Sequence, residues 1–268
     1  MNRVDVSPLR PLSDAECRHY RDELRAGRYA ALADAEGFDR ICFALEALGL
    51  RLLGRQADLG KYEDRIGFYA RLSPVLNELP KTHPSGFKPF GALYETVRKA
   101  RNDNMHLGAY ARHATGAAIE LCIALEEALM VDVKPTVGHV MVKSPITVEP
   151  WQPVAHARHL MLMHSFSFLP VRYQERWYLL SELALARFLS ASQTIKKARL
   201  GLTIEEAIER EPRLELVLVA MDRLLKAETP IEEVLHGAKV ADGPTLWLVV
   251  EDSHEDHLAG VLSPFELM

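Results

Sequence analysis

The chain has 268 residues, a formal net charge of −5 and 48% hydrophobic residues, which is the composition of an ordinary globular protein. This composition excludes a disordered chain, a collagen-like chain and a disulfide scaffold, and the length suffices for two domains. The leader up to Asp14 is interrupted by charges and contains no apolar run long enough for a signal peptide or a membrane span. We therefore expect a soluble, cytoplasmic protein without a membrane partner.

Charge is distributed unevenly between the two halves of the chain. Residues 1–134 contain 19 basic and 19 acidic side chains, whereas residues 135–268 contain 13 basic and 18 acidic ones. Duplex nucleic acids are bound largely through phosphate neutralisation, which needs a broad excess of basic side chains. We therefore expect no duplex DNA partner, and only a local, enclosed phosphate site stays open as a nucleic-acid hypothesis.

The cysteines have no spacing typical of a metal or redox site. Cys17, Cys42 and Cys122 are an odd number without a Cys-x-x-Cys pair, and each lies in a stretch with helical periodicity. We expect buried, reduced thiols.

Helical periodicity dominates the first half of the chain. Apolar residues from Phe38 to Leu52 recur every three or four positions, and Ser13 with Glu16 has the spacing of a capping box. Prolines between Leu79 and Pro89 predict a loop there. The pattern predicts an antiparallel helical bundle over residues 1–133. Its expected helices are 14–28, 39–55, 61–72 and 90–131, the last one broken near 101–108.

A short polar motif lies within this last helical stretch. Arg101 and His106 form an Arg-x4-His motif, with the polar Asn102 directly after the arginine. The motif and the helical pattern resemble HEPN domains, all-helical bundles that often act as metal-independent ribonucleases in toxin, defence and RNA-decay systems. The resemblance implies catalytic roles for Arg101, Asn102 and His106, an RNA substrate, and no cofactor for catalysis. It also implies a homodimer in which two copies of the motif face each other.

The chemistry of RNA cleavage suits this pair. Imidazole has the right pKa to move or orient the proton of a 2′-hydroxyl, and a guanidinium matches the oxygens of a phosphate that gains charge. Glu46, in the second predicted helix, is a candidate to orient Arg101, and a pair between Glu46 and Arg51 is the alternative. The alternative for the motif itself is that Arg101 and His106 only cap helix ends or join a surface ion network.

Shorter units follow residue 134, and they predict two tandem β-α-β-β-α units joined by a helical connector at about 191–222. The first unit would span about 136–190 and the second about 223–268, so that residues 134–268 contain an internal repeat. The overall fold class is thus a helical bundle followed by a paired α/β region. The expected strands are 137–141, 147–148, 168–171, 177–180, 246–250 and 258–262, and the expected helices begin at Val154, Ser181, Thr203 and Thr229.

The order of motifs in residues 134–268 resembles a CBS-domain pair. Val137–Pro150 and the later 169–171 and 179–181 segments are similar to a first repeat, and Leu258–Glu266 is similar to the end of a second one. CBS pairs commonly form regulatory modules that bind adenine nucleotides or related ligands in clefts between the repeats. The resemblance implies AMP, ADP or ATP as a regulatory ligand.

The resemblance also implies which residues contact that ligand. Ile146 and Thr147 belong to the first-repeat motif, and Ser181 and Ser263 occupy the two strand-to-helix turns. At such a turn a hydroxyl and free backbone amides suit a phosphate. In the family's Gly-x-x-Ser/Thr-x-x-Asp pattern the acid usually holds ribose hydroxyls, and Glu266 stands at that position of the second repeat.

The first repeat departs from this pattern, because Tyr178 and Ala184 replace the glycine and the acid. We therefore expect ribose binding in the second site only. The alternative for Ser263 and Glu266 is a capping box of purely local function.

Two histidine pairs have weaker signals. His156 with His159 and His254 with His257 have no third ligand at a recognised spacing. We assign no metal ligand in this chain.

These motifs together predict a HEPN-like, metal-independent endoribonuclease that a ligand-binding CBS pair regulates. The alternative is a non-catalytic, ligand-sensing CBS protein whose helical half is a docking domain. A third hypothesis, an inactive antitoxin-like partner, predicts co-purification with another chain.

Overall fold

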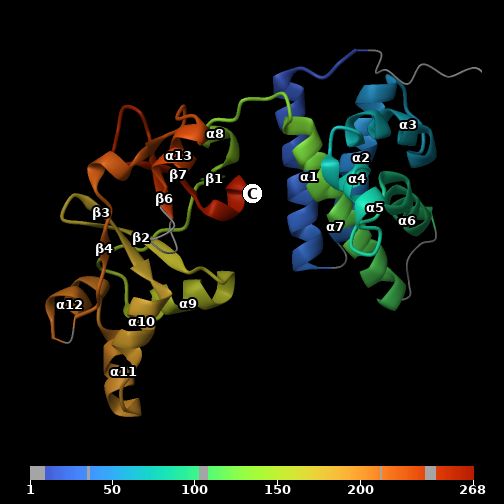
Figure 1. Ribbon diagram of the computed structural model, residues 1–268. Helices are drawn as coiled ribbons and strands as arrows, with labels where there is room; N and C mark the ends of the chain where they lie inside the picture. The colour runs from blue at the N-terminus through green and yellow to red at the C-terminus, as the bar shows by residue number, and fades with distance from the viewer. Residues whose placement is uncertain (1–9, 35–36, 103–107, 212, 239–245) are drawn as a thin grey trace, which may run out of the picture. The chain divides into compact units, whose positions relative to one another are not determined.

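The computed structural model describes residues 10–34, 37–102, 108–211, 213–238 and 246–268. It divides into two compact units, Met1–Lys134 and Pro135–Met268, and Figure 1 shows helices throughout the first unit and strands with neighbouring helices in the second. The helices of the first unit are α1 (Asp14–Ala33), α2 (Phe38–Leu53), α3 (Leu59–Ala70), α4 (Pro74–Asn77), α5 (Leu79–Thr82), α6 (Phe90–Asn102) and α7 (Gly108–Met130).

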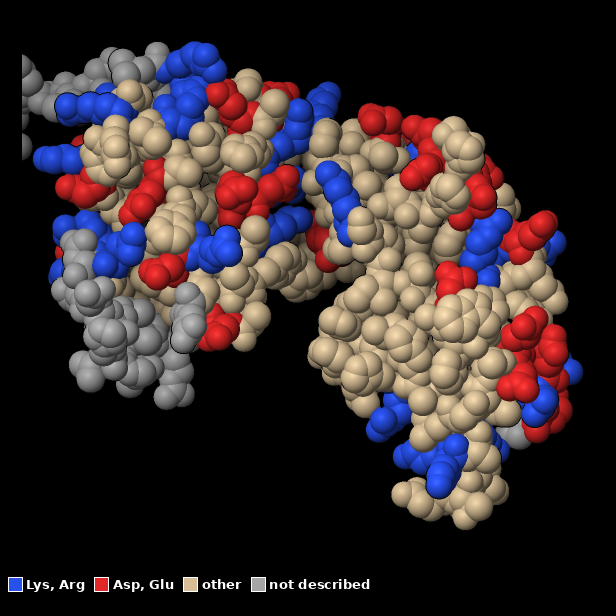
Figure 2. Space-filling view, turned by 180° about the vertical axis from the view of Figure 1, so that it is seen from behind, with Lys and Arg blue, Asp and Glu red and all other residues tan. Residues whose placement is uncertain are grey.

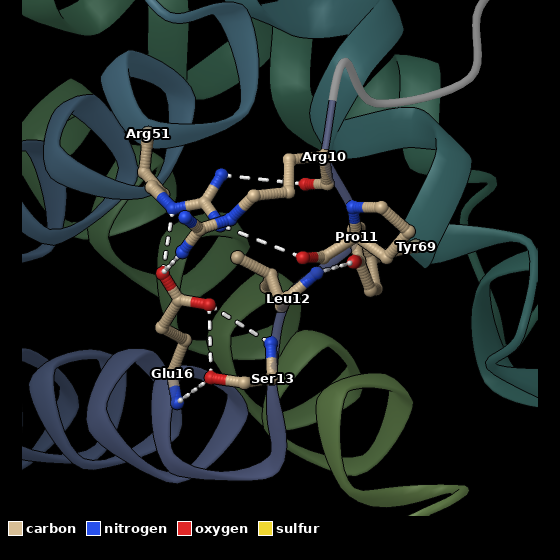
Figure 3. Close-up of polar contacts among 7 residues, drawn as sticks. All are labelled: Arg10, Pro11, Leu12, Ser13, Glu16, Arg51 and Tyr69. Atoms are coloured by element: carbon tan, nitrogen blue, oxygen red, sulfur yellow. Dashed lines mark hydrogen bonds and ion pairs between the residues drawn. The ribbon is translucent and has the colours of Figure 1, made fainter.

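The start of α1 is held by a capping box and by contacts to two other helices (Figure 3). The Ser13 hydroxyl accepts a hydrogen bond from the Glu16 backbone N–H at 3.3 Å, and the Glu16 carboxylate accepts one from the Ser13 N–H at 2.9 Å. Arg51 of α2 donates to the same carboxylate at 2.8 Å, and the Leu12 N–H donates to the hydroxyl of Tyr69 in α3 at 3.1 Å. Hydrogen bonds from Arg51 and Ser13 hold the pKa of Glu16 well below its ordinary value.

One continuous hydrophobic core joins the helices of this unit. α1 packs against α2 and α7, and α6 packs against α7. Leu24 of α1, Leu45 of α2, Ile66 of α3 and Leu121 of α7 are completely buried in it. The prediction of a helical first half is confirmed.

A charged cluster crosses the contact between α1 and α7. Glu126 of α7 is 6% exposed and accepts two hydrogen bonds from Arg28, at 2.8 and 3.0 Å. Arg25, one turn earlier on α1, donates to the same carboxylate at 3.3 Å. These bonds raise the pKa of Arg28 above its ordinary value. A buried carboxylate with several charge-assisted partners is costly to disturb.

Two expectations for the first half are corrected. α1 continues past Arg28 to Ala33, because Ala31 still packs into the core. The loop expected from Leu79 is wrong at its start, since Leu79–Thr82 forms a helical turn. Pro80 lies at one of the first positions of that turn, where a helix tolerates proline.

The second unit combines short strands and helices. Its elements are α8 (Val137–Val140), β1 (Val142–Lys143), α9 (Val154–His164), β2 (Phe168–Tyr173), β3 (Arg176–Ser181), α10 (Glu182–Leu189), α11 (Gln193–Gly201), α12 (Ile204–Glu209), β4 (Val217–Leu218), η2 (Met221–Arg223), β5 (Leu225–Lys226), α13 (Ile231–Gly237), β6 (Trp247–Val250), β7 (Leu258–Leu262) and η4 (Pro264–Leu267).

The strands form two sheets. β2, β3 and β4 make an antiparallel sheet, with Phe168 opposite Ser181. The other sheet has the order β1-β7-β6-β5, in which only the β5–β6 pair is parallel among the described strands. β1 comes early in the unit but pairs with β7, with Val142 opposite Val261. This pairing joins the beginning of the unit to its last strand.

The strand expected at Val137–Met141 is wrong. Thr136 begins a helical turn there, and Val137 and Val140 are both buried, at the i, i+3 spacing of a helix face. The strand at Thr147–Val148 is also wrong, because Val148 makes only an isolated bridge to Val171. The expected connector is not wholly helical, since β4 lies within it.

The core of the second unit is divided into three clusters of buried residues. The largest surrounds β2 and β3 and includes Val148, Leu169 and Leu180. Another joins α8, α13 and β7, and the third includes Trp177 and Leu248. A cavity can form where two such clusters meet.

The thiols of Cys17, Cys42 and Cys122 are free and buried, as expected. Burial raises the pKa of Cys42 to about 12. Among the described helices, none has the length and apolar character that crossing a membrane requires. Figure 2 shows basic and acidic side chains intermingled over the helical unit, in keeping with its balanced charge.

Candidate functional site

A cavity of about 640 Å³ lies in the second unit, where segments distant in the sequence meet. The first part of its lining comes from residues within 142–146, which lie in and just after β1. The second part comes from residues within 165–170, which lie just before and at the start of β2, and the rest comes from Leu246 and from residues within 261–266, at and just after the end of β7. The pairing of β1 with β7 brings the first and last of these segments together. The volume falls within the range of about 300–1,000 Å³ that is typical of small-molecule sites.

Three of the five predicted ligand residues line this cavity. Ile146 comes from the first-repeat motif, and Ser263 and Glu266 come from the end of the second. Thr147 and Ser181 are not among its lining residues. Ser181 instead caps α10, where its hydroxyl accepts a hydrogen bond from the Ala184 N–H at 3.1 Å.

Ser263 and Glu266 form the capping box that sequence reasoning offered as an alternative. The Ser263 N–H and hydroxyl donate to the Glu266 carboxylate oxygen Oε2, at 2.8 and 2.6 Å. The Ser263 hydroxyl in turn accepts a hydrogen bond from the Phe265 N–H at 3.2 Å. The expectation of free backbone amides at this turn is therefore corrected, because the cap itself uses them.

Sequence reasoning missed several residues of the lining. Phe166, Phe168 and Phe265 contribute aromatic rings, and Ser144 and Ser165 contribute hydroxyls. Both serines have left-handed backbone conformations, with φ of 51° and 55°. A non-glycine residue held in that region costs about 1–3 kcal/mol, and such residues cluster at functional sites. The Ser-Phe alternation at 165–168 is the signal that could have pointed to this part of the lining.

The first unit contains a second candidate, at the C-terminal end of α6. The Arg101 guanidinium lies 3.4 Å from the Glu46 carboxylate and 3.7 Å from that of Asp39, both on α2. It also lies over the ring of Phe43, 5.3 Å from the ring centre. The predicted contact of Glu46 with Arg101 is confirmed, and the alternative partner, Arg51, binds Glu16 instead.

The rest of the Arg-x4-His motif is less fully described. Asn102 is the last residue of α6. His106 lies outside the described residues. The geometry of the pair formed by Arg101 and His106 thus stays a prediction.

Two of the other histidines lie close together. His254 and His257 stack, with ring centres 5.3 Å apart, in an exposed turn. Over the described ranges, no group of three or more His, Cys, Asp or Glu side chains is placed to hold a metal ion.

Comparisons with known proteins give matches among solved structures only. No protein-family model matches the chain, and no curated protein matches it. CBSX2 from Arabidopsis thaliana, in complex with AMP, matches at 17% identity over 50% of this chain and 93% of that one, with a TM-score of 0.36. The CBS-domain pair of MJ0100, in complex with 5′-methylthioadenosine and S-adenosyl-L-methionine, matches at 17% identity over 50% and 93%, with a TM-score of 0.35. CbpB, in complex with c-di-AMP, matches at 14% identity over 50% and 83%, with a TM-score of 0.36.

Proposed function

We propose that residues 135–268 form a ligand-sensing unit of the CBS-pair type and that the cavity beside β1 and β7 is its ligand site. The observation that supports this most directly is the meeting of Ile146, Ser263 and Glu266 in one cavity. The sequence motifs singled out these residues separately, and they lie at opposite ends of the unit. An adenine nucleotide or a related compound is the ligand class that the motif resemblance implies.

The residues of the cavity suit a ligand with a planar ring and polar substituents. The rings of Phe166, Phe168 and Phe265 supply apolar surface for stacking. The hydroxyls of Ser144 and Ser165 supply donors and acceptors in a largely apolar site. Pockets with this combination are typical of small-molecule sites.

Binding can be tested with the full chain by calorimetry, using adenosine, AMP, ADP and ATP. The variant Ile146→Trp should fill the cavity and abolish binding without unfolding the chain, because Ile146 is 37% exposed. The matched control is Ile195→Trp, on α11 and 48% exposed, which should bind as the wild type does. Equal binding by both variants would place the ligand elsewhere and contradict the proposal.

A second candidate function is metal-independent RNA cleavage by the helical unit, with Arg101 and His106 as the reacting pair. The contact of Arg101 with Glu46 favours it, because a carboxylate on α2 can orient the guanidinium. An oriented guanidinium can stabilise charge on a phosphate that is under attack. Asn102 would assist in binding the RNA, and two subunits would supply the complete site.

The test is cleavage of a total-RNA and tRNA panel without added metal. His106→Ala and Arg101→Ala should each abolish cleavage, and Glu46→Gln should weaken it by about tenfold. The control is His113→Ala, which changes an exposed histidine on α7. Cleavage that persists in His106→Ala would exclude this candidate and leave the helical unit as a docking domain.

Regulation of one unit by the other belongs to the same proposal. A ligand shifts an equilibrium only by its difference in affinity for the two states. We therefore expect the ligand of the cavity to change the cleavage rate of the wild type but not that of Ile146→Trp. A non-catalytic sensing protein would show no cleavage and no effect of His106, and an antitoxin-like protein would co-purify with another chain.

A further inference from the structure

The turn after β7 has no unpaired amide at its first positions. Within residues 263–266, the Ser263 N–H donates to Glu266 Oε2, the Phe265 N–H donates to the Ser263 hydroxyl, and the Glu266 N–H donates to the Ser263 carbonyl at 3.2 Å. The remaining residue, Pro264, has no N–H. A phosphate oxygen at this turn would therefore have to compete with the cap for every donor.

The charge of the lining also disfavours a phosphate. Glu266 is the charged residue among the described residues that line the cavity. Lys143 lies between Val142 and Ser144, which both line the cavity. Lys143 itself is exposed and is not among the residues that line the cavity. A phosphate group would thus meet a carboxylate in a partly enclosed space, where repulsion is stronger than in water.

The remaining groups suit the uncharged parts of a nucleoside. Aromatic rings stack on a base, and such contacts contribute about 1–3 kcal/mol per base. Phe166 and Phe168 lie at the start of β2 and Phe265 lies on the opposite segment, so the cavity has rings from both repeats. The Ser263 N–H and hydroxyl both donate to Oε2 of the Glu266 carboxylate. Its other oxygen, Oε1, can accept a hydrogen bond from a ribose hydroxyl or be matched by a ligand cation.

We infer that this cavity selects a nucleoside-type ligand without phosphate, neutral or positively charged, over the corresponding nucleotides. The inference rests on the proposed sensing function and specifies the ligand class of the same site. Base and ribose bind to the aromatic rings and hydroxyls, and the carboxylate of Glu266 excludes anionic groups.

The experiment is calorimetric titration of the full chain with adenosine, AMP and ATP at one ionic strength and without added metal. We expect adenosine to bind at least about tenfold more tightly than AMP, and ATP to bind most weakly, because each added negative charge increases the repulsion. Tighter binding of AMP or ATP than of adenosine would overturn the inference. If AMP or ATP bound more tightly but Ile146→Trp abolished their binding, the proposed sensing function would still stand.

A charge variant tests the negative charge of Glu266 separately from the role of this residue in the cap. Glu266→Gln keeps a side-chain oxygen that can accept the cap hydrogen bond from Ser263 but removes the negative charge. We expect the preference for adenosine over AMP to fall by about tenfold in this variant. Glu232→Gln, at an exposed position on α13, is the control and should keep the preference. An unchanged preference in Glu266→Gln would overturn the role of the carboxylate, and absence of binding by all three probes would overturn both this inference and the sensing function.

Discussion

The two units of this protein build their interiors in different ways. The helical unit has one continuous core, whereas the second unit has three smaller clusters, and the cavity lies where two of them end. Phe166 packs against the cluster around β2, and Phe168 and Val261 pack against the cluster of Trp177 and Leu248, while all three also line the cavity. The comparison teaches that a divided core can leave a cavity of small-molecule size without any buried charge among its described residues.

The helical unit shows the opposite arrangement. Its described buried apolar residues form one cluster, and charged side chains are buried in this unit as well. The described polar and charged residues that are buried all belong to the helical unit: Arg21, Arg28, Ser73, Thr115 and Glu126. The variants below test this contrast. Tryptophan fluorescence reports on the second unit alone, because all three tryptophans lie there: Trp151, Trp177 and Trp247.

The largest effect is expected from the buried carboxylate. Glu126→Gln leaves Arg25 and Arg28 with a neutral partner at a site that is 6% exposed. Breaking such a pair from one side costs about 3–5 kcal/mol. Urea unfolding followed by circular dichroism should shift to lower denaturant, while tryptophan emission should report an unchanged second unit. Glu120→Gln, at an exposed position on the same helix, is the control, and an equal shift in both variants would refute the role of the cluster.

A matched pair of core variants compares the two interiors directly. Leu45 and Leu248 are both completely buried, the first in the continuous core and the second in the small cluster near the cavity. Leu-to-Ala changes cost about 2–5 kcal/mol, and the cost is smaller where neighbours can relax into the space. We expect Leu45→Ala to be the more destabilising of the two in urea unfolding. The reverse order would show that the second unit is packed as tightly as the first.

A smaller effect is expected where α2 approaches α3. A Cβ atom at Gly49 would lie 2.2 Å from Cγ of Tyr62, a ring that is 2% exposed. Gly49→Ala should therefore destabilise the helical unit by about 1–3 kcal/mol through overpacking. Gly116→Ala on α7, where no atom lies within 4 Å of the new Cβ, should instead stabilise it by about 0.5–1 kcal/mol. Thermal unfolding that shifts in the same direction for both variants would contradict this account.

The smallest effect concerns acid stability at the start of α1. Hydrogen bonds from Arg51 and Ser13 hold the pKa of Glu16 below its ordinary value of 4.5. A carboxyl with a lowered pKa contributes stability that is present above its ordinary pKa and is lost as the pH falls through the folded value. The wild type should lose stability relative to Glu16→Gln as the pH is lowered below about 4.5. Parallel stability curves for the two proteins between pH 7 and pH 3 would show that Glu16 contributes nothing.

Local patterns in the sequence predicted most of the elements but fewer of the contacts. The capping box at Ser13 and Glu16, the helix α2 and the strand β7 follow from spacing over a few residues. The sequence also predicted the contact of Glu46 with Arg101, because both residues lie on helices that the spacing of apolar residues indicates. The pattern failed at Val137–Met141, where a short segment resembled a brief strand but the buried pair Val137 and Val140 lies on one face of a helical turn.

The cavity was decided by the tertiary structure. Ile146 and Ser263 are distant in the sequence but line the same cavity, and no local pattern specifies which strand is the neighbour of another. The cap at residues 263–266 is local, and the sequence offered it as one of two alternatives, but the structure was needed to show that the cap is formed and uses the amides of the turn. Helices and caps depend on residues a few positions apart, whereas a ligand site depends on contacts between distant segments, and these form only when the chain packs.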